Sequence, residues 1–215
     1  MSFCAVIFDM DETLVASGSI WKRAELKLFD LIGKPYNEEV ARLYKGKSAM
    51  DVGRTIYTQY HPENLTADEC GRMLRQWLIE EFHGEVCPMP GADSLVKNLA
   101  GKIDMAVASG SPSEAISGVL DRFGWTDCFK AVVSSEEVEK GKPEPDVFLE
   151  AAHRLGCPPE NVLVFEDSIH GVHAAKKAGM TCFVVPSTDN PAITGTADRS
   201  FSSLSEISLK DILGE

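Results

Sequence analysis

The sequence has no closely spaced cysteine pair, no cluster of basic residues and no apolar run long enough to cross a bilayer. Its 33 Asp and Glu outnumber its 21 Lys and Arg, which gives a formal net charge of -12. This charge argues against a nucleic-acid-binding surface, because such a surface needs clustered cations that displace counterions. The first residues lack the basic and apolar regions of a secretory signal. We therefore expect a cytoplasmic protein with neither a membrane nor a nucleic-acid partner.

The cysteines are scattered without the spacing of a metal site: Cys4, Cys70, Cys87, Cys128, Cys157 and Cys182. This distribution predicts reduced thiols, as expected in the cytosol. Cys4 and Cys182 each fall in an apolar run, which favours core packing over a nucleophilic role.

The chain is large enough for one domain with a smaller insert, since it has 215 residues and 44% hydrophobic content. Short apolar runs of strand length alternate with helical patterns near the start and again after residue 88. The predicted strands are residues 4–8, 105–108, 131–133, 162–165 and 181–185. Alternation at this spacing implies right-handed βαβ units. The predicted fold class is therefore α/β, with a Rossmann-like parallel sheet.

The segment between the first two strands has a different pattern. Apolar residues recur there at steps of three and four, and no convincing strand appears. We interpret residues 15–87 as an all-helical cap domain, and residues 1–14 with 88–215 as the α/β catalytic core domain. Because the insert leaves from the carboxyl end of the first strand, we expect it to lie over that edge as a lid. We interpret Trp21, in its first helix, as a core residue.

Carboxylates crowd the ends of two predicted strands. Asp9, Asp11 and Glu12 follow the first strand, and Glu166 with Asp167 follow the strand at 162–165. The carboxyl ends of parallel strands share one edge, where open α/β sheets bind ligands. Hard divalent cations take carboxylate and carbonyl oxygens, so one cation would offset the charge of both groups.

Candidate anion-binding groups follow other strands. The Ser109 hydroxyl and the Gly110 amide can cradle an anion where a helix begins, although the same residues are common in ordinary turns. We expect Ser111 to cap that helix. Two prolines stiffen the loop that carries Lys142, and a solvated loop lysine is the alternative interpretation.

Two further lysines, Lys45 and Lys47, lie in a loop of the predicted cap. They are candidates for contact with an anionic substrate, and surface solubility explains them equally well.

Four of these motifs, in this order, resemble the haloacid dehalogenase superfamily. They are Asp9-Met-Asp-Glu-Thr-Leu14, Ser109-Gly110, Gly141-Lys-Pro-Glu-Pro145 and Glu166-Asp-Ser-Ile-His-Gly171. Within the superfamily the chain is similar to the phosphatases and phosphomutases related to β-phosphoglucomutase, which carry a helical cap. The resemblance covers nearly the whole chain.

The resemblance implies a role for each motif. Asp9 would be the nucleophile that forms an aspartyl-phosphate, and Asp11 the general acid and base. Ser109, Gly110 and Lys142 would bind the phosphoryl group. The implied Mg2+ ligands are Asp9, Asp11 through its backbone carbonyl, Glu166 and Asp167. Attack by an anionic carboxylate on a phosphoryl group needs such cations to offset the repulsion.

The predicted function is a Mg2+-dependent phosphomonoester hydrolase that acts, as a monomer, on a small phosphorylated metabolite such as a sugar phosphate. A hexose-phosphate mutase is one alternative, but Trp21 stands where the β-phosphoglucomutases carry a histidine. A non-catalytic binding or regulatory protein is the other, and the intact Asp9 and Asp11 speak against it. The chain also has Glu12 where glycine is usual in this branch. We expect substrate specificity to lie in the cap, with Lys45 and Lys47 as candidates.

Overall fold

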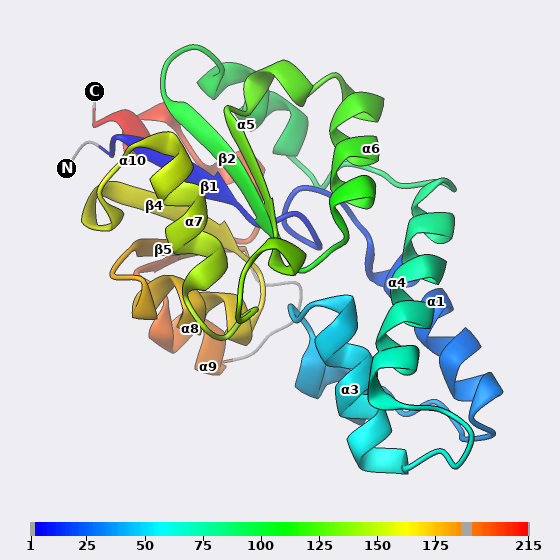
Figure 1. Cartoon of the computed structure of the whole chain (residues 1–215). Coiled ribbons are helices and arrows are strands. Elements are labelled where there is room, and N and C mark those ends of the chain that lie inside the picture. The colour runs from blue at the N-terminus through cyan, green and yellow to red at the C-terminus, as the bar shows by residue number, and fades with distance from the viewer. Residues whose placement is uncertain (1–2, 186–190, 215) are drawn as a thin grey trace.

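The computed structural model describes residues 3–185 and 191–214 and contains a parallel sheet with helices on both faces (Figure 1). The strand order among these residues is β3-β2-β1-β4-β5-β6, and every pair is parallel. The strands are β1 (Ala5–Phe8), β2 (Asp104–Ser109), β3 (Ala131–Ser134), β4 (Val162–Glu166), β5 (Thr181–Val184) and β6 (Arg199–Ser200). The predicted α/β fold with a Rossmann-like sheet is confirmed.

The central strands are buried on both faces, which is why they appear in the sequence as continuous apolar runs. In β1, Val6 and Phe8 face a core that includes residues of α5 (Ala92–Leu99) and α6 (Ser113–Phe123). Ala5 and Ile7 face the opposite core. That second core includes residues of α7 (Asp146–Leu155), α8 (Ile169–Lys177) and α9 (Pro191–Thr196), whereas α10 (Leu209–Leu213) packs on the first.

The strand order reverses at β1, which lies between β2 and β4. Phe8 is in register with Val107 of β2 and with Phe165 of β4. The residues that follow these three positions therefore meet at one edge. In open α/β sheets, the crevice at such a reversal is where ligands bind.

The chain between β1 and α5 forms helices and, within its described residues, no strand. These helices are α1 (Gly18–Leu31), α2 (Glu38–Ala41), α3 (Ala49–Tyr60) and α4 (Ala67–Phe82). Figure 1 shows α1, α3 and α4 beyond the end of the sheet toward which β1 and β2 point. None of the described helices combines the length and the apolar character that crossing a membrane requires.

The two connections between the sheet and these helices run side by side. Val15 forms an isolated bridge with Pro88. The amide of Ala16 donates to the Cys87 carbonyl, and the amide of Met89 donates to the Leu14 carbonyl, both at 2.9 Å. The division into domains at residues 14 and 88 stays a prediction, and this pairing lies where that division was drawn.

The helices α3 and α4 touch through their backbones. A Cβ added to Gly53 of α3 would lie 2.3 Å from the amide nitrogen of Gly71 in α4. Atoms cannot approach so closely, so both positions exclude a side chain. Two glycines thus set the distance between these helices.

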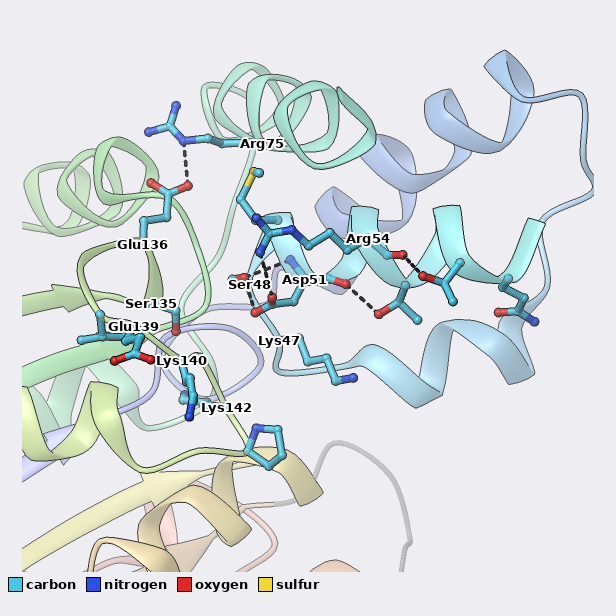
Figure 2. Close-up of a pocket in the computed structure, with 17 residues that line it drawn as sticks. Lys47, Ser48, Asp51, Arg54, Arg75, Ser135, Glu136, Glu139, Lys140 and Lys142 are labelled. Carbon is cyan, nitrogen blue, oxygen red and sulfur yellow. Dashed lines mark hydrogen bonds and ion pairs between the residues drawn. The ribbon is translucent and has the colours of Figure 1, made fainter. Parts of the chain in front are cut away.

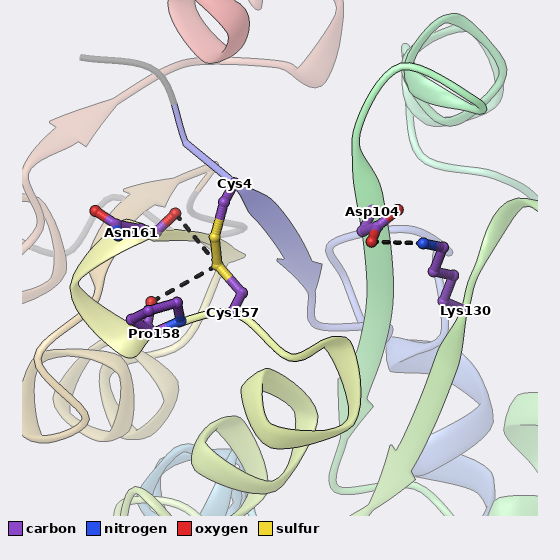
Figure 3. Close-up of a disulfide and its surroundings, with 6 residues drawn as sticks. All are labelled: Cys4, Asp104, Lys130, Cys157, Pro158 and Asn161. Carbon is purple, nitrogen blue, oxygen red and sulfur yellow. Dashed lines mark hydrogen bonds and ion pairs between the residues drawn. A yellow bond between two sulfur atoms is a disulfide. The ribbon is translucent and has the colours of Figure 1, made fainter.

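The prediction that all cysteines are reduced is wrong for Cys4 and Cys157, which form a disulfide (Figure 3). Cys4 also lies outside β1 and is exposed, so it is not a core residue. The pairing of β1 with β4 brings these residues together, because the Cys4 amide donates to the Asn161 carbonyl at 2.9 Å, just before β4. The two cysteines are 153 positions apart in the sequence, so they gave no local signal. Cys182 is free and buried in β5, as predicted.

We expect Gly53→Ala to lower the free energy of unfolding by about 1–3 kcal/mol, because the added methyl group forces α3 and α4 apart. Gly118→Ala in α6 is a matched control, since no atom lies within 4 Å of its added Cβ. The control should gain about 0.5–1 kcal/mol, because alanine favours a helix over glycine. Urea unfolding of both variants measures the difference, and equal effects would contradict the close packing.

Candidate active site

A buried lysine stands at the centre of the acidic cluster. Lys142 is 1% exposed, and its Nζ donates to Asp9 Oδ1 at 2.6 Å, to Glu166 Oε1 at 2.8 Å and to the Ala108 carbonyl at 3.1 Å. Burial disfavours the ammonium, but the two carboxylates outweigh burial and raise the pKa of Lys142. Lys142 is therefore a fixed cation, and the alternative of a solvated loop lysine is wrong.

The two carboxylates that contact Lys142 differ in how they hold a proton. Burial raises the pKa of Asp9 well above its ordinary value; Lys142 offsets part of this, and the neighbouring acids raise it further. Burial also opposes ionisation of Glu166, but Lys142 and the amides of Asp167 and Ser168 lower its pKa overall. These amides each donate to Glu166 Oε2 at 2.8 Å. The acidic cluster around Lys142 therefore still favours the binding of a second cation.

Asp11 is held by four hydrogen bonds, two on each carboxylate oxygen. Its Oδ1 accepts from Ser17 Oγ at 2.7 Å and from Trp21 Nε1 at 2.9 Å. Its Oδ2 accepts from Ser109 Oγ at 3.0 Å and from Ser111 Oγ at 2.7 Å. Donors from both the sheet side and α1 thus fix the orientation of this carboxylate.

Three of these donors were not found by sequence reasoning. Trp21 was interpreted as a core residue, but its indole nitrogen bonds Asp11. Ser111 was expected to cap a helix, yet α6 begins at Ser113 after Pro112, and the Ser111 hydroxyl donates to Asp11 instead. Ser17 precedes α1 without capping it. A serine before a helix usually caps it, so the pattern gave no sign of these contacts.

Ser109 lies beside Asp11, and its predicted role with Gly110 in binding a phosphate stays a prediction. The Ser109 hydroxyl accepts from the Ser111 amide at 3.0 Å while it donates to Asp11. A Cβ on Gly110 would lie 2.6 Å from the Lys47 carbonyl. The turn after β2 therefore touches the backbone of the loop between α2 and α3.

That loop also contacts the end of β4. Lys45 Nζ lies 2.7 Å from Asp167 Oδ2, and Asp167 is 3% exposed. His170 Nδ1 hydrogen-bonds the Lys45 carbonyl at 3.0 Å. The predicted cap lysine is thus beside the predicted metal ligands, paired with one of them.

Glu12, which departs from the glycine usual in this branch, has a φ of +59°. This left-handed region favours glycine, which explains the usual residue. The Glu12 carboxylate accepts from the Gly18 amide at 2.7 Å, where α1 begins. A hydrogen bond at a helix N-terminus offsets part of the backbone strain.

Three buried acids fit a hard divalent cation. Asp9, Glu166 and Asp167 each offer a carboxylate oxygen, and these oxygens lie within 4.8 Å of one another. Carboxylate oxygens are the donors that Mg2+ takes in proteins. The side chain of Asp11 is not in this group, and its oxygens accept from the four donors described above. The expected contribution of its main-chain carbonyl stays a prediction.

The structure contains a large cleft and a smaller pocket near these acids. The cleft, of about 930 Å³, lies between α3, α4 and the loop after β3, and Figure 2 shows Arg75 paired with Glu136 there. The smaller cavity, of about 270 Å³, is lined by Asp9, Asp11 and Asp167 and by residues of α1. We call it the catalytic pocket, because the cleft does not reach Asp9 or Asp11.

The far wall of the catalytic pocket carries a buried acid that the sequence analysis missed. Glu25 of α1 is 5% exposed, and its Oε2 accepts from the Tyr36 hydroxyl at 2.9 Å. Burial raises the pKa of Glu25 to about 7. Its signal in the sequence was an acid among the apolar positions Trp21, Ala24 and Leu28 of one helix.

The comparison with protein families is consistent with this geometry. A family model described as haloacid dehalogenase-like hydrolase matches residues 6–185. A hexitol phosphatase B of Escherichia coli is 31% identical over 98% of this chain and 96% of its own length. A bifunctional riboflavin kinase/FMN phosphatase of Arabidopsis thaliana is 32% identical over 98% of this chain, which spans only 55% of that protein.

A solved structure with the same fold is a β-phosphoglucomutase from Clostridium difficile. The TM-score is 0.84 at 22% identity, and the match covers 97% of this chain and 95% of the other. This likeness shows the fold.

The raised pKa of Glu25 predicts a pH dependence of stability. Between its ordinary pKa near 4.5 and its folded pKa of about 7, the folded chain holds a proton that the unfolded chain releases. The free energy of unfolding should therefore fall as pH rises through this range, by on the order of 2–3 kcal/mol. Glu25→Gln should lose this contribution and exceed the unmodified protein in stability at pH 8.

Urea unfolding of both proteins at pH 4.5 and pH 8 gives the measurement. The difference between them cancels the titration of all other groups. A difference that stays constant over this range would contradict the burial of an ionisable Glu25.

Proposed function

The chain belongs to the haloacid dehalogenase-like hydrolases as a phosphoric monoester hydrolase, and from that membership we propose Mg2+-dependent hydrolysis of a small sugar or polyol phosphate through an aspartyl-phosphate at Asp9. The observation that carries this proposal is Lys142, a buried ammonium that bridges Asp9 and Glu166. A carboxylate that must attack an anionic phosphoryl group needs a fixed cation beside it.

In the first half-reaction, an Asp9 oxygen forms a bond to phosphorus as the bond from phosphorus to the leaving oxygen breaks. The leaving oxygen keeps the electron pair of the broken bond and takes a proton from the Asp11 carboxyl group. In the second, a water molecule attacks phosphorus and gives its proton to Asp11. The bond from phosphorus to Asp9 then breaks, which releases phosphate and regenerates both carboxyl groups.

The roles of the surrounding groups follow from their positions. Lys142 offsets the charge that Asp9 brings to the phosphoryl group. The Ser109 hydroxyl, which donates to Asp11 in this structure, would turn its proton to a phosphoryl oxygen and bind it with the Gly110 amide. Asp9 and Asp167, with Glu166 and the Asp11 carbonyl, would hold the metal. When bound, Mg2+ supplies positive charge to the reacting oxygens.

Hydrogen-bond donors hold Asp11, the proposed general acid and base, in one orientation. Ser17, Ser111 and Trp21 aim Asp11 at the pocket, so proton transfer needs no reorientation of this side chain. Indole nitrogen donates hydrogen bonds but takes up no proton, so Trp21 cannot relay a proton as a histidine can. This supports water over a second sugar as the phosphoryl acceptor, and hence a hydrolase over a mutase.

The size of the substrate is suggested by the pocket and by the relatives. The catalytic pocket, of about 270 Å³, suits a compact leaving group. A hexitol phosphatase is among the relatives that match along nearly their whole length. Both support a small phosphorylated sugar or polyol as substrate, and the monomeric state stays a prediction.

We expect Asp9→Asn to lose essentially all turnover of p-nitrophenyl phosphate with Mg2+ present, because an amide cannot act as the nucleophile. Its circular dichroism and melting temperature should show a folded protein. Asp30→Asn, the same change at an exposed position of α1, is the control and should keep full activity. Turnover by Asp9→Asn at the unmodified rate would exclude covalent catalysis at this residue.

Removing Mg2+ with EDTA should abolish turnover, and added Mg2+ should restore it. Asp167→Asn should raise the dissociation constant for Mg2+ by about tenfold or more, because one carboxylate ligand is lost. Titration calorimetry with Mg2+ alone measures this constant independently of turnover. Unchanged Mg2+ affinity in this variant would show that Asp167 is not a ligand.

A further inference from the structure

We infer that Glu25, Tyr36 and Tyr44 form a recognition site for the hydroxyl groups of an uncharged, polyhydroxylated leaving group. We call these residues the cap subsite. The inference rests on the proposed function and narrows its substrate class to neutral sugar and polyol phosphates. It excludes substrates whose leaving group carries a carboxylate or a second phosphate where it meets these residues.

The cap subsite and the catalytic acids line one pocket. On α1, Trp21 bonds Asp11, and Glu25 lies four residues further along the same helix face. One helical turn rises about 5.4 Å, so Glu25 lies about one turn further from the chemistry than Trp21. A leaving group that extends from the phosphate along α1 would therefore reach Glu25.

Glu25 has hydrogen-bonding capacity left for a ligand. Among the described residues, the hydrogen bond from Tyr36 is the one that its carboxylate accepts. Lys22, the cation that acts on it, is 2.6 Å from Glu38 and paired with that residue. A carboxylate can accept several hydrogen bonds, so Glu25, which lines the pocket, can accept more from a ligand.

The Tyr44 hydroxyl is a second polar group whose hydrogen bonding is not satisfied by the described residues. It is 1% exposed, it lines the catalytic pocket, and its buried hydroxyl has no hydrogen-bond partner in the part of the chain that the structure describes. Unpaired buried hydroxyls are rare, because each loses its bonds to water. The hydroxyl is therefore a second group in the pocket wall that the described residues leave without a hydrogen bond.

The hydrogen-bonding groups of the cap subsite favour alcohols over charged groups as ligands. A carboxylate accepts from an alcohol O–H, and a tyrosine hydroxyl can donate to or accept from one. At pH 8, above the pKa of about 7 that burial gives Glu25, a carboxylate or phosphate on the leaving group would instead meet the charge of Glu25, and like charges in a partly dry site repel. Lys45 does not reverse this preference, because it is paired with Asp167.

The test compares two compounds that differ at one end. Sorbitol 6-phosphate ends in CH2OH where 6-phosphogluconate ends in a carboxylate. At pH 8, where Glu25 is ionised, the unmodified protein should favour sorbitol 6-phosphate in kcat/KM by about tenfold or more. Glu25→Gln, which keeps the shape and an acceptor for Tyr36, should reduce this preference to near unity. Glu85→Gln, the same change at an exposed position outside the pocket, should retain it.

Tyr44→Phe tests the unpaired hydroxyl. It should lower kcat/KM for sorbitol 6-phosphate by about threefold to tenfold, the loss of one hydrogen bond. Its melting temperature should not fall, because no protein partner is lost. A fall in melting temperature with unchanged kcat/KM would assign the hydroxyl to the fold and overturn its role in binding.

Binding measurements separate the failure of this inference from that of the proposed function. An absence of turnover by the unmodified protein on either compound and on p-nitrophenyl phosphate would refute the proposed function. Titration calorimetry on Asp9→Asn, with and without Glu25→Gln, still compares the affinities for the two compounds. Equal affinities in Asp9→Asn, or a preference that survives Glu25→Gln, would overturn the cap subsite.

Discussion

The structure depends on one buried ammonium. Lys142 arrives on a loop far along the chain and lies between Asp9 and Glu166, whose carboxylates would otherwise repel each other in a dry environment. Parallel strands force these acids together, because β1 and β4 are neighbours and end at the same edge. The parallel sheet therefore brings the negative charges of Asp9 and Glu166 together. Lys142, which offsets both charges, is also suited to phosphoryl chemistry.

Several groups in this region oppose folding. Asp9 and Glu25 are buried carboxylates with raised pKa values, and the Tyr44 hydroxyl has no partner among residues 3–185 and 191–214. A chain selected for stability alone would replace them with apolar residues of similar size. They lie along a single pocket, which is consistent with the binding and catalytic roles proposed for them, because perturbed groups concentrate at functional sites.

The sheet and the acids at its edge could be predicted from the sequence, because a strand buried on both faces is a continuous apolar run that ends abruptly in polar residues. The convergence on Asp9 then followed from parallel topology. The contacts of Asp11 with Ser17 and Trp21 could not be predicted, since they depend on how α1 is rotated and where it starts. The pairing of Cys4 with Cys157 likewise depends on strand register, and Glu25 was hidden within an ordinary helical pattern.

The adjacent connections at Leu14 and Met89 have an evolutionary consequence. Because the backbones of these residues are hydrogen-bonded to each other, the two covalent connections of the segment between them leave the sheet at one point. A gene segment that encodes a different set of helices could be exchanged there in one recombination event, and the strands and their acids would stay in place. Such a junction lets a lineage acquire new selectivity without rebuilding its reactive machinery.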